Sequence, residues 1–317
     1  MKIFRKERLN NGYRYIYFLG IRVFSYRKTE KFPYKSDINY KTYNDMLVDI
    51  KQNITKLPTD IDYIVGIPRS GMIPAYMLGL ALNKPVCTLQ EFVLQKFGKH
   101  GVTREIDETS IIKKILFIDD TVNTGLSMTK VKQEIGELVH KYECIFGAVY
   151  ATNKKSMDYV DFAFCILPQP RLFQWNYMNH GFLKWMALDI DGVLCIDPTE
   201  EQNDDGENYK QFILNAKPLY VPKVEVGALV TSRLEKYRKE TEFWLSAHGV
   251  KYKNLYMLKG VSAEERRKSG LHAKYKAKVY KKLKGIKMFV ESDDKQAQEI
   301  AKLTSKHVFC ASNDKLY

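Results

Sequence analysis

The stretch Ile115-Leu-Phe-Ile-Asp-Asp-Thr-Val-Asn-Thr-Gly-Leu-Ser-Met-Thr129 decides the fold of the first half of this chain. Its four leading apolar residues predict a buried strand over 115–118, because a strand that is covered on both faces is apolar without alternation. Two neighbouring carboxylates, Asp119 and Asp120, follow where that strand is expected to end. An acidic pair at the end of a buried strand indicates a ligand-binding site.

The residues after the acidic pair predict a site for an anion. They are small and mostly polar, namely Thr121, Asn123, Thr124, Gly125 and Ser127. A helix is expected next, with an apolar face formed by Val131, Ile135, Leu138 and Val139. Free backbone N–H groups and the positive end of a helix dipole meet at such a turn and attract phosphate. Carboxylates repel phosphate, so the acidic pair is expected to accept hydrogen bonds from two neighbouring sugar hydroxyls.

This strand, acidic pair and Thr-Gly turn resemble the phosphoribosyl pyrophosphate signature of type I phosphoribosyltransferases, without a gap from Ile115 to Ser127. The resemblance implies that Asp119 and Asp120 bind the ribose and that the turn holds its 5-phosphate. It also implies that Mg²⁺ bridges the diphosphate oxygens of the donor. The competing interpretation is a plain strand-to-helix turn with a solvated acidic pair.

An earlier loop has the same organisation. An expected strand over 63–67 is followed by Pro68-Arg69-Ser70-Gly71 and by a helix expected over 73–82. This order resembles the pyrophosphate loop of the same family, which precedes the signature loop. The resemblance implies that Arg69 supplies positive charge while Ser70, Gly71 and nearby N–H groups close on the diphosphate.

The segment between Cys87 and Ile111 has a polar centre that contains two glycines. Type I transferases close a loop in this region over the diphosphate, so the resemblance implies a similar loop here. Lys96, Lys99, His100 and Arg104 have suitable chemistry there, and Lys99 and Arg104 are the predicted substrate-binding residues. Further strands over 144–151 and 159–167 are expected to complete a parallel sheet.

A second centre of chemistry begins at Met186-Ala-Leu-Asp-Ile-Asp-Gly-Val-Leu194. Two carboxylates that are two residues apart on an extended segment point to the same side, which suits a divalent metal and attack on phosphorus. The sequence resembles the first motif of haloacid-dehalogenase-type phosphohydrolases. The resemblance implies that Asp189 is the nucleophile that forms an aspartyl-phosphate, and that Asp191 is the general acid and base.

Later motifs of the same family follow in order. The run from Gly227 predicts a strand that ends in a hydroxyl residue, Thr231, which by resemblance binds the transferring phosphoryl group. The third-motif lysine is expected on a helix, with Lys276 as the first choice and Lys274 as the alternative.

The fourth motif follows a last apolar strand and supplies acids for Mg²⁺. Glu291 has the best position, and Asp293 is the second candidate, with Asp294 as its alternative. The predicted magnesium ligands are therefore Asp189, Asp191, Glu291 and Asp293. This chain has Glu and Ser where many members of that family have Gly and Asp.

The 317 residues, 45% of them hydrophobic, suffice for two domains. The predicted class is α/β, with two Rossmann-like domains: a type I phosphoribosyltransferase parallel sheet and then a haloacid-dehalogenase-type sheet with a small cap. The expected parts are a basic, aromatic leader (1–33), the transferase domain (34–168), an aromatic connector (169–184) and the phosphatase domain (185–317).

Three smaller expectations concern the surroundings of these domains. Aromatic and β-branched residues around Leu19-Gly20 predict a short hairpin in the leader. In the connector, Phe173 and Trp175 are expected to fill the interface between the domains. The insertion over 199–215, which carries several acids, is expected to be an acidic surface loop that shapes a shallow cap.

The formal charge of +14 favours anionic partners. No nucleic-acid-binding module is recognisable, so nucleic acid is not expected as a partner. The leader resembles the basic, aromatic leaders of many bacterial surface-polysaccharide glycosyltransferases and suits the surface of a membrane. The expected location is the cytoplasm, with peripheral contact at the inner membrane face, and the five cysteines are expected to be reduced.

Together the two centres predict a bifunctional enzyme, with an oligomer as a further option. Ribose 5-phosphate would pass from phosphoribosyl pyrophosphate to a glycan acceptor, expected to be lipid-linked, and the 5-phosphate would then be removed. Two alternatives stay open. One is a nucleobase or orotate-type phosphoribosyltransferase with a fused phosphatase. The other is a regulator that senses phosphoribosyl pyrophosphate and binds nucleic acid through its positive charge.

Overall fold

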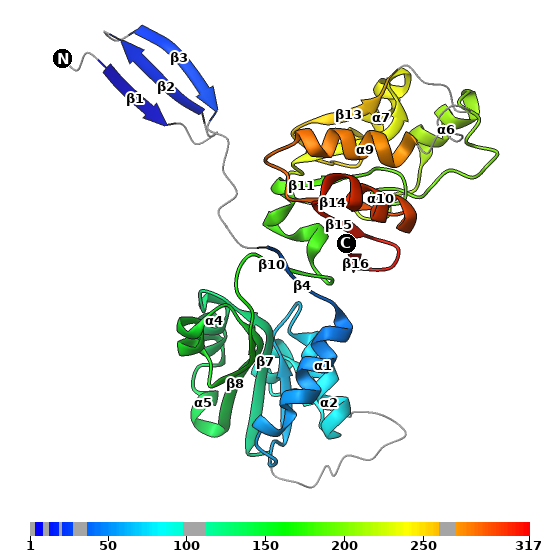
Figure 1. The fold of residues 1–317 in the computed structure, drawn as a ribbon. Helices are drawn as coiled ribbons and strands as arrows, with labels where there is room; N and C mark the ends of the chain where they lie inside the picture. The colour runs from blue at the N-terminus through cyan, green and yellow to red at the C-terminus, as the bar shows by residue number, and fades with distance from the viewer. Residues whose placement is uncertain (1–3, 9–12, 19–20, 28–36, 98–111, 260–270) are drawn as a thin grey trace.

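The computed structural model describes residues 4–8, 13–18, 21–27, 37–97, 112–259 and 271–317, the first three ranges by their backbone alone. It is an α/β protein with two mainly parallel sheets and a short two-stranded ribbon (Figure 1). Three N-terminal strands, β1 (Phe4–Arg8), β2 (Tyr13–Phe18) and β3 (Ile21–Arg27), form a separate antiparallel sheet. The pairing of β2 with β3 agrees with the predicted hairpin, to which β1 adds a strand.

The first large sheet has the order β6-β5-β7-β8-β9, and all its strands are parallel. Its strands are β5 (Tyr63–Gly66), β6 (Val86–Thr88), β7 (Lys114–Val122), β8 (Glu143–Ala151) and β9 (Phe162–Ile166). The helices beside it are α1 (Tyr43–Asn53), η1 (Ile54–Lys56), α2 (Met72–Leu82), α3 (Leu89–Val93), α4 (Leu126–Ile135), α5 (Leu138–Lys141) and η2 (Lys154–Tyr159). Strand order reverses between β5 and β7, where open α/β sheets bind ligands.

Strand β7 is buried on both faces, as its apolar run predicts. Ile115 and Phe117 pack in the core under α3 and α4, whereas Leu116 and Ile118 pack in the core under α1 and α2. All four side chains are fully buried. Successive side chains of a strand point to opposite faces of the sheet, so alternate residues of β7 pack in the cores on its two faces.

Two boundaries differ from the sequence expectation. Strand β7 continues through the acidic pair to Val122, because its ladder with β8 continues as far as the pairing of Val122 with Ala151. The predicted helix after the turn is broken at Gly136, whose φ is +49° and which ends α4. Leu138 and Val139 therefore lie in the separate short helix α5.

The second large sheet has the order β13-β12-β11-β14-β15-β16, in which only β16 runs antiparallel to its neighbour. Its strands are β11 (Met186–Leu188), β12 (Ala228–Leu234), β13 (Leu255–Leu258), β14 (Met288–Glu291), β15 (His307–Cys310) and β16 (Lys315–Leu316). The helices of this half are η3 (Tyr177–Asn179), η4 (Gly181–Trp185), α6 (Glu207–Asn215), η5 (Glu235–Tyr237), α7 (Arg238–Ala247), α9 (Leu271–Lys282) and α10 (Asp294–Thr304).

Three further boundaries also correct the sequence expectation. Strand β12 runs past Thr231 to Leu234, so the hydroxyl residue lies within the strand. The insertion over 199–215 is not only a loop, since α6 buries Tyr209, Phe212 and Ile213 against the second core. Strand β9 begins at Phe162, because the residues before it form η2.

A parallel ribbon of β4 (Asn39–Lys41) and β10 (Arg171–Phe173) lies between the two large sheets (Figure 1). Phe173 joins the first domain's core, and Trp175 packs against it. The predicted connector contains β10, and these two aromatics pack in the first domain and not in the interface between the domains. Tyr40 makes the contact with the second sheet instead, with its ring 5.4 Å from that of Phe309.

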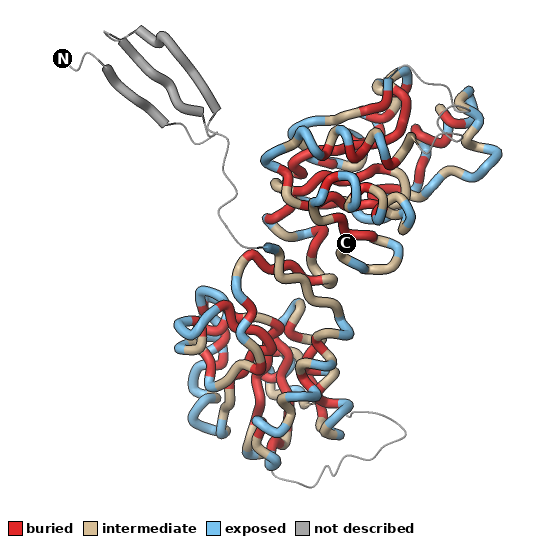
Figure 2. Tube along the Cα trace, in the orientation of Figure 1, coloured by how far each residue is buried: buried red, intermediate tan, exposed pale blue. Residues whose placement is uncertain are grey.

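The buried hydrophobic residues of the described ranges cluster on both faces of each large sheet. The red stretches of Figure 2 concentrate in these two sheets. All five cysteines are free thiols, as predicted. None of the helices in the described ranges is both long and apolar enough to cross a membrane.

Candidate active sites

The two loops predicted for the first site lie against each other at the reversal of strand order. The Ile67 N–H donates to the Ile118 carbonyl oxygen at 3.0 Å, which extends β5 along β7. A methyl group at Gly71 would lie 2.5 Å from the Ile67 oxygen and 2.7 Å from the Ile118 oxygen. Only glycine fits there, because both obstacles are backbone atoms. Arg69 is exposed and Ser70 is partly exposed beside it.

The acidic pair of the first site is buried, with 8% of Asp119 and 2% of Asp120 exposed. The Asp120 N–H donates to Oδ1 of Asp119 at 2.8 Å, and the Ser127 hydroxyl lies 3.5 Å from Oδ2. Burial, and next the charge of Asp120, raise the pKa of Asp119 well above its ordinary value. Because both carboxylates are buried, little water can donate hydrogen bonds to them, and a ligand with hydrogen-bond donors would be favoured at this site.

The turn after the acidic pair is fixed to the neighbouring strand end. Oδ1 of Asn123 accepts a hydrogen bond from the Thr152 hydroxyl at 2.9 Å, and its carbonyl oxygen accepts one from Ser156 at 2.7 Å. Gly125 has a φ of +74°, and a methyl group there would lie 2.1 Å from the Tyr159 ring. The N-terminus of α4 follows, so its first N–H groups face an anchored turn.

Two other predicted residues of this turn differ in exposure. Thr124 is exposed, so it is open to a ligand, whereas the Thr121 hydroxyl is buried without a hydrogen-bond partner. Lys99 and Arg104, the predicted diphosphate-binding residues, lie outside the described part of the chain.

Sequence reasoning missed one contact of the first site. The indole N–H of Trp175, which follows β10, donates to Oδ2 of Asp120 at 2.7 Å. The two residues are 55 positions apart, and Trp175 belongs to no motif of the resemblance. The aromatic density of the connector was the available signal, but it gives no partner for any one ring.

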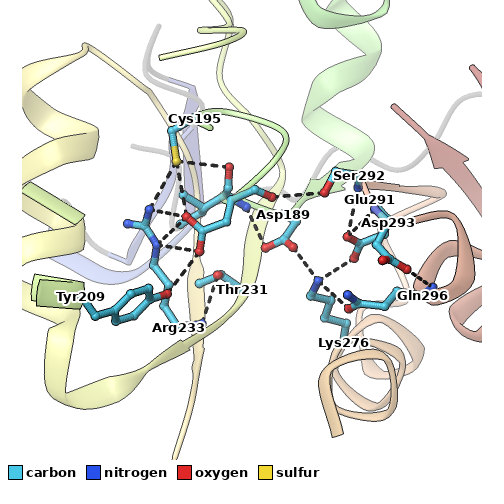
Figure 3. A network of polar contacts seen from close by, with 12 residues as sticks. Asp189, Cys195, Tyr209, Thr231, Arg233, Lys276, Glu291, Ser292, Asp293 and Gln296 are labelled. Atoms are coloured by element: carbon cyan, nitrogen blue, oxygen red, sulfur yellow. Dashed lines mark hydrogen bonds and ion pairs between the residues drawn. The ribbon is translucent and has the colours of Figure 1, made fainter. Parts of the chain in front are cut away.

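The second site has a lysine between two carboxylates at the ends of adjacent strands (Figure 3). Lys276 Nζ lies 2.5 Å from Asp189 Oδ2 and 2.6 Å from Glu291 Oε2, and it also donates to Gln296 at 3.1 Å. All three charged residues are at least 95% buried. Burial lowers the pKa of Lys276, but the two carboxylates raise it by more, so the amine stays charged. Lys274, the alternative, is exposed.

The second carboxylate of the motif is held by an arginine that was not among the predicted residues. Nη2 of Arg233 lies 2.6 Å from Oδ1 of Asp191, and its Nε lies 3.2 Å from both oxygens. The Arg233 side chain has no exposed surface. Tyr209 and Cys195 also donate to Asp191, at 3.3 Å and 3.4 Å. A bidentate ion pair in a buried setting fixes the plane of the Asp191 carboxylate.

One cavity of about 710 Å³ is lined by Asp189, Asp191, Tyr209, Arg233, Lys276 and Glu291. Thr231 lies at its wall, and its hydroxyl accepts a hydrogen bond from the Arg233 N–H at 3.2 Å. Asp197, which the sequence reasoning did not select, lines the same cavity. Burial, and then the charges of Asp191 and Asp189, raise the pKa of Asp197 above its ordinary value. The wall of the cavity therefore brings several carboxylates together with Lys276 and Arg233.

The predicted magnesium ligands differ in how well they suit a metal. Asp189, Asp191 and Asp293 line the cavity, and their carboxylate oxygens are the donors that Mg²⁺ prefers. In this structure, however, Oδ2 of Asp189 accepts from Lys276, and both oxygens of Asp191 accept from Arg233. Glu291 is engaged elsewhere: its Oε2 accepts from Lys276, and its Oε1 accepts from the N–H groups of Ser292 and Asp293. Within the described residues, no three His, Cys, Asp or Glu side chains are gathered as a metal cage.

Comparison with known proteins gives low similarity only. No family profile matches the sequence, and no curated protein matches it. The structure is similar to a Helicobacter pylori xanthine-guanine-hypoxanthine phosphoribosyltransferase, at 17% identity and a TM-score of 0.34, over 44% of this chain and 93% of that one. A purine phosphoribosyltransferase from Pyrococcus horikoshii gives 21% identity and a TM-score of 0.32, over 44% and 95%. A Pnkp1/Rnl/Hen1 complex gives 12% and 0.24, over 88% and 98%. TM-scores this low do not by themselves assign a function.

Proposed function

We propose that this chain is a bifunctional enzyme. Its first domain transfers ribose 5-phosphate from phosphoribosyl pyrophosphate to a glycan acceptor, and its second domain then removes the 5-phosphate. The observation that carries the proposal is the pairing of two different carboxylate sites in one chain. One is the buried pair of Asp119 and Asp120 beside a glycine loop, and the other is the Asp189–Lys276–Glu291 arrangement.

In the first step, Asp119 and Asp120 accept hydrogen bonds from the two ribose hydroxyls. The anchored turn and the N-terminus of α4 bind the 5-phosphate, and the loop that ends at Gly71 binds the diphosphate. The acceptor hydroxyl bonds to the anomeric carbon as the bond to pyrophosphate breaks, and the hydroxyl proton leaves to solvent. Charge that develops on the sugar ring is stabilised by the nearby acidic pair.

In the second step, an oxygen of Asp189 attacks phosphorus while the bond to the ribose 5-oxygen breaks. Lys276 keeps the attacking carboxylate in place, and Thr231 holds a phosphoryl oxygen. Protonated Asp191, oriented by Arg233, gives its proton to the leaving alcohol. It then takes a proton from the water that attacks phosphorus, while the bond between phosphorus and Asp189 breaks and phosphate leaves. Mg²⁺, when bound by Asp189, Asp191 and Asp293, would neutralise charge on the phosphoryl group.

The order of the two reactions follows from their products. The first product keeps a phosphate ester on a primary alcohol, which is the substrate class of the second reaction. Nucleotides retain this phosphate, whereas ribofuranose in a glycan does not carry it, so the pair of activities favours a glycan acceptor. The basic, aromatic N-terminal residues suit an acceptor that is linked to lipid.

The test supplies the full chain with phosphoribosyl pyrophosphate, Mg²⁺ and either lipid-linked glycans or free nucleobases, and measures pyrophosphate, phosphate and product mass. We expect pyrophosphate and phosphate in equal amounts with the glycan arm. The Asp189→Asn variant should release pyrophosphate only and accumulate a phosphoribosylated glycan. Consumption of a nucleobase instead would favour the nucleobase transferase. Turnover in neither arm, with salt-dependent binding of nucleic acid, would favour the regulator.

A further inference from the structure

Trp175 connects the first site to the segment that leads into the second domain. Its N–H donates to Oδ2 of Asp120 at 2.7 Å, and only 2% of Asp120 is exposed. A buried carboxylate is costly unless donors satisfy its oxygens. The bond therefore does two things: it compensates the burial of Asp120, and it fixes the direction of one oxygen and with it the plane of the carboxylate.

Neighbouring aromatic rings fix the indole itself. Phe173 stacks on Trp175 with ring centres 4.7 Å apart and an interplanar angle of 18°, and Tyr150 stacks on Phe173 at 5.5 Å. The Tyr43 ring also lies 5.5 Å from the indole, tilted by 42°. Gln174 accepts a hydrogen bond from the Tyr43 N–H at 2.8 Å, which fastens the connector to the start of α1. The indole is thus rigidly held before any ligand arrives.

Trp175 could have one of two roles: its ring could stack on the acceptor, or its N–H could position Asp120. Phe173 covers one face of the indole in parallel geometry, which leaves at most one face for stacking. The polar edge of the ring donates to Asp120. This hydrogen bond is the observation that favours action through the carboxylate.

We propose that Trp175 is a positioning residue for Asp120, so that the connector after β10 is a part of the transferase site. The inference rests on the proposed function, since it assumes that Asp120 binds the ribose of the donor. It also makes the first activity dependent on a segment that lies beyond the last strand of the first sheet.

Trp175→Phe tests the proposal, because it keeps an aromatic ring in the stack and deletes the N–H. The matched control is Trp185→Phe, which makes the same change at another half-buried tryptophan, the last residue of η4. We expect binding of phosphoribosyl pyrophosphate with Mg²⁺, measured by calorimetry, to weaken about tenfold in Trp175→Phe and to stay unchanged in Trp185→Phe. The KM for the donor should rise more than kcat falls.

A double-mutant cycle with Asp120→Ala tests whether Trp175 acts through this carboxylate, because alanine offers the indole N–H no acceptor. In the Asp120→Ala background, Trp175→Phe should have little further effect on donor binding. Equal and additive effects in both backgrounds would overturn the proposal. So would donor binding by Trp175→Phe that equals binding by Trp185→Phe.

Fluorescence keeps the proposal testable if Trp175→Phe does not fold. In the Trp185→Phe protein the remaining tryptophans are Trp175 and the fully buried Trp244. Titration with the donor should then change the emission of Trp175, and unchanged emission despite calorimetric binding would contradict the proposal.

If the unaltered chain does not bind the donor at all, the proposed function fails, whereas binding that is insensitive to Trp175→Phe overturns the positioning role alone.

Discussion

Leu172 and Phe173, adjacent on strand β10, belong to the cores of different domains. Leu172 packs with the second core and Phe173 with the first, and both are at least 97% buried. Because successive side chains of a strand point to opposite faces, one residue step suffices to anchor the ribbon to both halves. This relationship makes the ribbon a structural link between two sites of different chemistry.

The first prediction follows from this division. Leu172→Ala should destabilise the second domain by about 2–5 kcal/mol and Phe173→Ala the first by about 3–5 kcal/mol, because each change leaves a cavity in one core. Hydrogen exchange should show faster exchange in β11 and β12 for the first variant, and in β7 and β8 for the second. Leu303→Ala, at a side chain that is 43% exposed, is the control. Equal effects of either variant on both sheets would contradict the division.

A second prediction concerns the buried lysine of the second site. Lys276→Met leaves Asp189 and Glu291 buried without a counter-charge, so we expect a loss of about 3–5 kcal/mol in the unfolding free energy of this domain. Phosphatase activity should be lost as well. Lys274→Met, two positions away at an exposed site of the same helix, should change stability by about 0.5 kcal/mol or less. Urea unfolding measures the stability of both variants. Similar losses of unfolding free energy in Lys276→Met and Lys274→Met would refute the role of Lys276.

A third prediction uses the raised pKa of Asp119, which burial and then the charge of Asp120 produce. The pKa of Asp119 in the unfolded chain is about 3.9, and its pKa in the folded chain is higher. At a pH between these two values, Asp119 is protonated in the folded chain and ionised in the unfolded chain. The contribution of Asp119 to stability therefore falls as pH rises through that window. Asp119→Asn should flatten this fall and make the chain more stable at pH 8 while abolishing donor binding.

Urea unfolding between pH 4 and pH 8 measures this effect. Glu134→Gln, at an exposed acid of α4, serves as the control and should keep the pH dependence of the unaltered chain. An Asp119→Asn protein with the same slope as the control, or with lower stability at pH 8, would be inconsistent with the buried acidic pair.

The fourth prediction concerns the close approach of the two loops at Gly71. Gly71→Ala would bring its methyl group to 2.5 Å from the Ile67 oxygen, so the start of α2 must shift away from Ile67 and β7. We expect a loss of about 1–3 kcal/mol in stability and a loss of donor binding. Gly181→Ala meets no atom within 4 Å and should be tolerated. Calorimetric titration with the donor distinguishes the two, and undiminished binding by Gly71→Ala would contradict this arrangement.

The sequence by itself determined which strands are buried and where the polar turns interrupt them. An uninterrupted apolar run such as Ile115–Ile118 is a local property, because burial on both faces removes the alternation of polar residues. The α/β class of the fold could be predicted for the same reason. Element ends were less accurate, since the pairing of β7 with β8 extended the strand through Asp119 and Asp120.

Only the tertiary structure decided which distant side chains complete the sites. The bonds from Trp175 to Asp120 and from Arg233 to Asp191 span 55 and 42 positions, and no local pattern selects one tryptophan or one arginine among several. The choice depends on where separate elements come to lie after packing. Sequence periodicity records which face of an element is buried, whereas the partner of a buried polar group is fixed by the register and crossing of elements that are far apart in the chain.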